Sequence, residues 1–220
     1  MVVLKRSGIK LKGDLIFAGT VGEEGPGEGM EKFVLNPIKA DGAIVGEPSN
    51  FEYAIGHRGL EWIEIEVIGK GAHGGTPELG INAIVKAAQL IVKLDEKIGQ
   101  NLHQRFHPHM GPAVMNIGFI KGGTQPSTVA DRCIIQLDRR YIPGETVDSV
   151  VKEIQDVVDE MAAQDPQFKA IVSRMPENLM EFHDHVPLVT PEDSPFVSSV
   201  KKVLRYINKG NEPTLTTRRG

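Results

Sequence analysis

The chain has 220 residues, 40 % hydrophobic and 25 % charged, which is an ordinary composition for a soluble globular protein. The net charge of −4 comes with no basic block, and no apolar run approaches the roughly 18 residues of a membrane-spanning helix. A nucleic-acid partner and a membrane partner are therefore not expected. The N-terminus lacks a secretory signal pattern and Cys133 is the single cysteine, so we expect a cytoplasmic protein without disulfides.

Two acidic turns follow short apolar runs near the N-terminus. Residues 15–18 precede Gly22-Glu23-Glu24-Gly25, and residues 43–45 precede Gly46-Glu47-Pro48-Ser49. Such apolar runs are typical of buried parallel strands, and ligands bind outside the carboxyl ends of parallel strands. Three carboxylates at one sheet edge repel one another, and a bound cation removes that repulsion. The pattern therefore predicts a metal site, with a solvated acidic turn as the alternative.

Glu23 and Glu24 suit two different tasks in such a site. Neighbouring side chains on an extended backbone point to opposite sides. One carboxylate can then ligate a metal while the other accepts a proton from the metal-bound water. Spacing alone does not say which residue does which.

The pattern changes near residue 57. Residues 60–67 alternate apolar and charged side chains, which predicts a strand with one wet face in an antiparallel sheet. A glycine-rich loop, residues 69–80, carries His73. Further elements are expected as a helix at 81–94, strands at 113–120 and 129–141, a helix at 146–161 capped by Thr146, and a strand at 168–172. The order β-α-β-β-α-β is that of a ferredoxin-like sandwich, a four-stranded antiparallel sheet with two helices on one face.

We therefore predict an α/β fold with two parts. Residues 1–56 and 177–220 would form a partial parallel-sheet catalytic domain, and residues 57–176 an inserted ferredoxin-like α+β domain. The buried face of the first sandwich helix is expected to be formed by seven apolar residues: Ile81, Ile84, Val85, Ala88, Ile91, Val92 and Leu94. A further amphipathic helix is expected over residues 194–206.

Other side chains have a chemical and a structural interpretation. His73 lies among four glycines, so we expect a mobile loop whose imidazole could donate to an oxyanion when a lid closes, or simply an exposed histidine. Arg140, at a strand end, is a candidate carboxylate-binding fork, with a surface arginine as the alternative. Cys133 is expected to be a buried strand residue. The remaining histidine clusters, at residues 103–109 and 183–185, are not expected to join the metal site.

Six segments carry a resemblance to a known family: Gly19-Thr20-Val21-Gly22-Glu23-Glu24, Gly46-Glu47-Pro48-Ser49, Gly56-His57-Arg58-Gly59, Gly71-Ala72-His73-Gly74, Gly122-Gly123-Thr124, and residues 138–145. In this order they resemble the co-catalytic metallopeptidase family of acetylornithine deacetylase, succinyl-diaminopimelate desuccinylase, aminoacylase and carboxypeptidase G. The resemblance runs over nearly the whole chain. It implies a zinc-dependent hydrolase with two Zn²⁺ ions per intact site, for which Co²⁺ or Mn²⁺ can substitute.

The resemblance also implies roles for particular residues. Glu23 would be the general base that activates water, while Glu24 would ligate one zinc ion and Glu47 the other. The inserted domain would be a lid and dimerisation domain, and His73 would reach across a homodimer into the partner's active site.

Two arginines match positions that grip the substrate carboxylate in this family, Arg140 and Arg58. Ser127 stands where an asparagine is often found. The family's upstream His-x-Asp segment and bridging aspartate have no match in residues 1–22, and its last histidine ligand belongs beyond Gly220. We therefore expect a metal-dependent hydrolase of amide bonds in N-acyl amino acids or small peptides, inactive as this truncated chain. The alternative is a non-catalytic dimerisation module.

Overall fold

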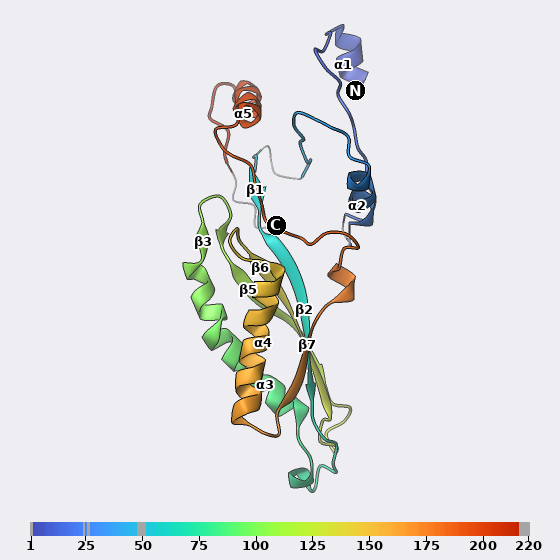
Figure 1. Ribbon diagram of the computed structural model, residues 1–220, viewed down its shortest axis with the longest axis vertical. Coiled ribbons are helices and arrows are strands. Elements are labelled where there is room, and N and C mark those ends of the chain that lie inside the picture. The colour runs from blue at the N-terminus through green and yellow to red at the C-terminus, as the bar shows by residue number, and fades with distance from the viewer. Residues whose placement is uncertain (1, 24, 26, 48–51, 216–220) are drawn as a thin grey trace.

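The computed structural model describes residues 2–23, 25, 27–47 and 52–215. Its centre is a four-stranded antiparallel sheet in the order β5-β6-β2-β7 (Figure 1). These strands are β2 (Gly59–Ile68), β5 (Val114–Gly122), β6 (Arg132–Tyr141) and β7 (Lys169–Arg174). Helices α3 (Ala83–Lys97) and α4 (Val147–Gln164) lie side by side on one face of the sheet. The ferredoxin-like sandwich is thereby confirmed.

The core lies between this sheet and its two helices. In β2 and β6 every second side chain is buried, and Ile63, Ile65 and Val67 of β2 pair with Leu137, Ile135 and Cys133 of β6. This alternation follows from the two-residue repeat of a strand, which sends successive side chains to opposite faces. Cys133 is fully buried as predicted, and burial raises the pKa of its thiol.

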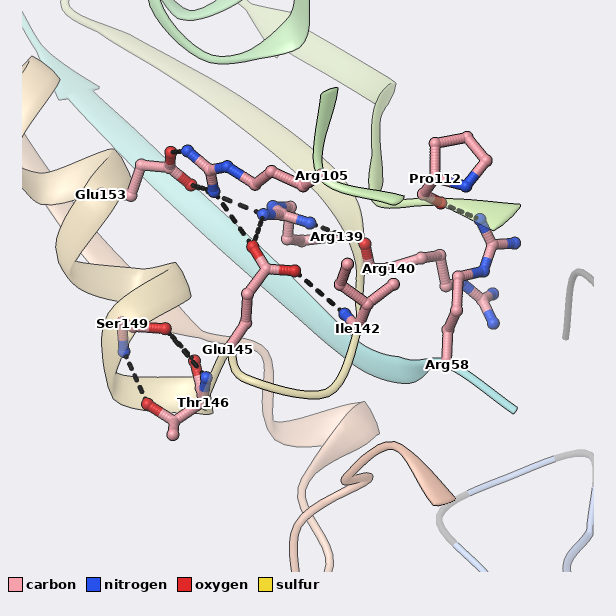
Figure 2. A network of polar contacts seen from close by, with 10 residues as sticks. All are labelled: Arg58, Arg105, Pro112, Arg139, Arg140, Ile142, Glu145, Thr146, Ser149 and Glu153. Atoms are coloured by element: carbon pink, nitrogen blue, oxygen red, sulfur yellow. Dashed lines mark hydrogen bonds and ion pairs between the residues drawn. The ribbon is translucent and has the colours of Figure 1, made fainter. Parts of the chain in front are cut away.

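Both sandwich helices begin at capped residues. The Asn82 side chain accepts hydrogen bonds from the backbone N–H groups of Ile84 and Val85 at the start of α3. Thr146 caps α4 as predicted, in a reciprocal capping box with Ser149 (Figure 2). These caps satisfy N–H groups that the first helical turn leaves without an acceptor.

The predicted buried face of α3 is right for Leu94 and partly for Ile91, but wrong for Ile84, Val85, Ala88 and Val92. The residues fully buried against the sheet are Ala83, Ala87, Leu90 and Leu94. Ile84, Ala88 and Val92 are exposed instead, one above another at a spacing of four residues. Apolar residues occur almost all around this helix, so the sequence offers two candidate faces, and only packing on the sheet selects one.

The two N-terminal segments predicted as buried parallel strands are extended but form no strand. Phe17 is 82 % exposed, and Ile44 and Val45 are 75 % exposed. A parallel strand needs backbone partners on adjacent strands and a cover on both faces, and the described part of the chain supplies neither. That prediction is therefore wrong for these residues.

Short elements flank the sandwich. They are α1 (Val2–Ser7), α2 (Glu28–Leu35), β1 (Gly56–His57), β3 (Phe106–His107), β4 (Gly111–Pro112), β8 (Leu188–Val189), α5 (Pro195–Ile207), and 3₁₀ turns at Pro77–Leu79, Gly99–Gln104 and Pro176–Asn178. Strands β1 and β8 pair where the chain enters and leaves the sandwich. Helix α5 matches the amphipathic helix expected there. No helix among the described residues is long and apolar enough to span a bilayer. The boundaries 1–56, 57–176 and 177–220 stay predictions.

Candidate functional site

The turn that carries Glu23 is stabilised by two hydrogen bonds to a single backbone carbonyl. The backbone N–H groups of Gly25 and Gly27 both donate to the carbonyl oxygen of Gly22, at 3.0 Å each. Gly22 has a φ of 78°, which favours glycine, and the Glu23 side chain is exposed on this turn just before α2. An exposed carboxylate on a tight turn can reach a ligand that approaches from outside.

The hydrogen bonds of the Gly22 turn do not test the two predicted metal ligands, Glu24 and Glu47. Glu24 lies outside the described residues, and Glu47 is exposed in an extended segment. Within the described residues no group of three or more His, Cys, Asp or Glu side chains could hold a metal ion. A zinc pair requires about three protein ligands per metal, so these residues alone do not fit one. The roles of Glu23, Glu24 and Glu47 stay predictions.

A buried carboxylate next to this turn was missed by sequence reasoning. Glu31 of α2 is 4 % exposed, and its two carboxylate oxygens accept the N–H groups of Glu181 and Phe182 at 2.9 Å each. Glu31 thereby ties the helix that follows Glu23 to a segment 150 residues away. Nothing in the sequence marks it, because α2 carries two glutamates and one lysine, and any of them could be the buried one.

The Glu31 contact predicts a pH-dependent docking of α2. The N–H of Phe182, followed by that of Glu181, lowers the pKa of the Glu31 carboxyl below 4.5 despite its burial. A lowered folded-state pKa means that the contribution to stability is complete above the ordinary pKa and is lost as the pH falls through the lower value. The protection factors of the Glu181 and Phe182 amides, which compare observed with intrinsic exchange at the same pH, should therefore fall as the pH is lowered. Glu31→Ala should remove the protection at every pH, whereas Glu28→Ala, on the exposed side of α2, should not. Slow exchange in Glu31→Ala would contradict this assignment.

His73 is exposed, and its loop is joined to residues 127–129 by backbone hydrogen bonds. His73 forms a backbone bridge with Thr128, and the N–H of Gly74 donates to the carbonyl of Ser127 at 2.7 Å. Ser127, placed where the family often has asparagine, therefore contacts the His73 loop through its backbone. Backbone hydrogen bonds to residues 127–129 anchor one side of the loop, and its mobility stays a prediction.

Arg140 is held by its strand neighbour two residues earlier. Its Nε and Nη2 atoms donate to the two carboxylate oxygens of Asp138 at 2.7 and 2.9 Å. The indole N–H of Trp62 donates to the same carboxylate at 3.3 Å. Asp138 uses one side of the planar guanidinium, so the Nη1 end is left to grip another carboxylate.

Arg58 and Arg140 lie at the same end of β2, whereas His73 does not. Arg58 directly precedes β2, and its Nη1 donates to the carbonyl of Pro112 at 3.0 Å (Figure 2). Arg140 pairs with Leu60, the second residue of β2. His73 lies in the loop beyond the other end of this strand. Ten residues of strand span about 30 Å, so His73 and Arg140 of one chain cannot contact the same small ligand.

A network of four charged residues fixes the backbone beside Arg140 (Figure 2). The fully buried Arg139 donates to Glu145 and to the carbonyl of Arg140, at 2.6 Å each. Glu145 also accepts the N–H of Ile142 at 2.9 Å. Arg105 contacts both Glu145 and Glu153 from the other side. The network therefore determines where the Arg140 backbone lies.

Sequence reasoning missed this network and a second buried ion pair, although both leave a signal. Arg139 occupies an inward position of β6, and Glu61 an inward position of β2. A charge on the apolar face of a strand requires a buried partner. Glu61 receives two hydrogen bonds from Arg174, at 2.9 and 2.8 Å, which raise the pKa of that guanidinium. Strand alternation therefore identifies buried charges, but not their partners.

Tyr141 joins the end of β6 to the segment that leaves the sandwich. Its hydroxyl donates to the carbonyl of His185 at 3.0 Å, and the N–H of Leu60 donates to the same carbonyl at 2.9 Å. Burial, followed by the negative charge of Glu61, raises the pKa of Tyr141 to about 12. The His185 carbonyl thus links β2, β6 and the C-terminal segment in the neighbourhood of Arg58 and Arg140.

Comparison with known proteins adds independent information. The family model described as peptidase dimerisation domain matches residues 55–166, just over half of the chain. An acetylornithine deacetylase of Vibrio cholerae is 28 % identical over 193 residues, which cover 86 % of this chain and 49 % of the relative. A peptidase M20 domain-containing protein of Schizosaccharomyces pombe is 28 % identical over 218 residues, 96 % of this chain and 51 % of the relative. The chain therefore spans about half the length of the curated relatives it matches.

Solved structures show the same fold. Aminopeptidase PepT of Bacillus cereus superposes with a TM-score of 0.66 at 23 % identity, covering 91 % of this chain and 49 % of that one. A tripeptidase of Staphylococcus aureus gives a TM-score of 0.59 at 24 % identity, covering 76 % of this chain and 40 % of that one. The family model, the sandwich and these relatives agree, and the predicted family is confirmed. The chain belongs to the M20 peptidase family, and residues 55–166 are its peptidase dimerisation domain.

Proposed function

We propose that this chain is the lid and dimerisation part of a metal-dependent hydrolase that cleaves amide bonds in N-acyl amino acids or small peptides. The observation that carries the proposal is the match of residues 55–166 to the peptidase dimerisation domain, within a sequence related to acetylornithine deacetylases over 86 % of its length. Relatives named deacetylase and peptidase both break a C–N bond of an amide. We further propose a cytoplasmic location, as for an enzyme of small metabolites.

In this proposal the residues of the chain have separate tasks. Arg140, with one side of its guanidinium held by Asp138, binds the carboxylate of the substrate, and Arg58 lies beside it. Glu23 takes a proton during attack on the carbonyl, while Glu24 and Glu47 each belong to one zinc ion. Zinc would supply the polarised water. His73 donates a hydrogen bond to the carbonyl oxygen of substrate held by a second chain.

The separation of His73 from Arg140 supports a homodimer. The two residues lie at opposite ends of β2, about 30 Å apart by strand rise, so a substrate that contacts both needs two chains. This distance is the reason for preferring a functional pair of chains over a monomer with an unused histidine.

An exposed apolar surface supports the same pairing. We call it the edge surface: Ile84, Ala88 and Val92 of α3 together with Ile120 of β5, which pairs with Ile135 and so lies on the face of the sheet that the helices cover. Strand β5 is an edge of the sheet, so it offers unpaired backbone groups to another strand. Ile84 lies against Gly122 at the end of β5, which makes the helix and strand parts continuous.

Breaking the edge surface should dissociate the pair. Ile120→Lys places a charge in the apolar contact and is expected to weaken self-association at least tenfold, which corresponds to about 1.4 kcal/mol. Ile171→Lys is the matched control, because Ile171 is equally exposed (54 % against 50 %) on the opposite edge strand β7. Sedimentation velocity over a range of concentrations measures both variants. A monomeric parent chain, or equal effects of the two substitutions, would reject the edge surface.

A non-catalytic dimerisation module is the second candidate. It is favoured by the family match, which covers the dimerisation domain alone. Zinc content and hydrolysis of an N-acetyl amino acid separate the two functions. Stoichiometric zinc with metal-dependent hydrolysis in the full-length protein supports the enzyme, whereas a metal-free, inactive dimer of the full-length protein supports the module.

A further inference from the structure

His73 makes one hydrogen bond through its ring, and that bond has a single possible direction. The backbone N–H of Gly75 lies 3.1 Å from His73 Nδ1. A backbone N–H is only ever a donor, so Nδ1 must offer its lone pair. In the neutral imidazole the proton is then on Nε2. The side chain is exposed, and no described residue pairs with Nε2.

The backbone around the ring keeps this contact in place. The N–H of Thr76 donates to the His73 carbonyl at 2.9 Å, which closes a turn over residues 73–76. On the other side, Gly74 and His73 are joined to Ser127 and Thr128. The Gly75 N–H is therefore presented to the imidazole by a turn that is itself held to a neighbouring segment.

His57 provides the opposite case in the same chain. Its Nδ1 lies 2.9 Å from the carbonyl oxygen of Arg58, which can only accept, so the neutral ring carries its proton on Nδ1. That arrangement resembles a metal-ligating histidine, which donates one ring N–H to an acceptor and ligates through the other nitrogen. His73 has the reverse arrangement, in which Nε2 is a donor and not a lone pair.

We propose that the Gly75 backbone N–H is a positioning group that selects the Nε2–H tautomer of His73. The exposed ring then serves as a hydrogen-bond donor to a carbonyl or oxyanion oxygen, and not as a metal ligand or a proton acceptor. This inference rests on the proposed function for the identity of the acceptor, an amide oxygen under attack. The tautomer itself follows from the contacts within one chain.

Gly75 also offers a way to break the contact. A Cβ at this position would lie 3.0 Å from Nδ1 and 3.2 Å from Cε1 of His73, so in Gly75→Ala the ring has to shift by a few tenths of an ångström, which weakens a hydrogen bond that is already 3.1 Å long. Gly71→Ala is the matched control in the same loop. Its Cβ would meet nothing closer than 3.9 Å, which is ordinary contact. Neither position has the positive φ that only glycine adopts readily.

The test is a long-range proton–nitrogen NMR spectrum of the metal-free chain labelled with ¹⁵N-histidine, at a pH where the imidazoles are neutral. His73→Gln and His57→Gln assign the signals. His73 is expected as the Nε2–H form and His57 as the Nδ1–H form. A hydrogen bond of ordinary net strength biases the His73 ratio roughly tenfold beyond that of the exposed His103. Gly75→Ala should shift His73 toward the His103 ratio, and Gly71→Ala should leave it unchanged.

Two results would overturn the inference: an Nδ1–H form of His73 in the parent chain, or a His73 ratio that Gly75→Ala does not change. Either result would leave the amide hydrolase proposal standing, because the spectrum involves neither substrate nor metal. Conversely, a full-length protein without hydrolase activity would not alter the tautomer. In the two glycine variants an unchanged His57 signal shows that the fold is intact.

Discussion

Replacing Glu145 with alanine is expected to lower the free energy of unfolding by about 3–5 kcal/mol. Glu145 is the main partner of Arg139, whose side chain is completely buried, and it also accepts the N–H of Ile142. Its removal leaves a buried guanidinium without its closest counter-charge. Glu153 lies 3.5 Å from Arg139 Nη2 and offsets part of the loss, so we expect the lower half of this range.

Urea denaturation followed by the fluorescence of Trp62, the single tryptophan, measures this loss. Lys152→Ala is the control. Lys152 pairs with Asp156 on the exposed side of α4, the same helix that carries Glu153, and solvent and salt screen an exposed pair of this kind, so the substitution should change the stability little. A loss below about 1 kcal/mol in Glu145→Ala would show that the network is not a buried charge cluster in solution. Domains of this size have 5–15 kcal/mol of stability, so the expected loss is easily measured.

Glu23→Gln, in the full-length protein, is expected to lower kcat by about 10²–10⁴-fold while zinc content stays unchanged. Glutamine keeps the size of the side chain and its place on the Gly22 turn, but it cannot accept a proton at neutral pH. The expectation depends on the proposed role of Glu23 as a base that does not ligate metal. Steady-state hydrolysis of an N-acetyl amino acid, with metal analysis of the same sample, measures both quantities.

Glu28→Gln is the matched control, because Glu28 is another exposed glutamate at the start of α2. It should leave kcat within about twofold. If Glu23→Gln loses zinc together with activity, Glu23 is a ligand and the roles of Glu23 and Glu24 are exchanged. If it retains full activity, the base assignment is wrong.

Much of the sandwich could be predicted from local sequence. The alternation in residues 60–67, the Thr146 cap and the spacing of apolar residues along α4 each depend on neighbours within a few positions. The motifs around Glu23, Glu47 and His73 likewise sufficed to indicate the family, which the match over residues 55–166 confirms. Their roles at the site remain predictions.

Other features were decided by contacts between distant residues. Apolar residues surround α3, and only packing on the sheet leaves Ile84 and Val92 exposed. The apolar run at residues 15–18 predicts a strand, but a strand requires adjacent strands to pair with, and the described residues provide none there.

The sequence by itself determined the sandwich, the family and the candidate residues, because period, caps and motifs are local properties of a chain. Only the tertiary structure decided that Arg139 is neutralised by Glu145, that His73 and Arg140 lie at opposite ends of β2, and that the Gly75 N–H meets the His73 ring. Each of these depends on how backbone segments approach in space. The way distant segments pack together decides which hydrogen bonds form and which charges are buried. The spacing of residues along the chain does not contain this information.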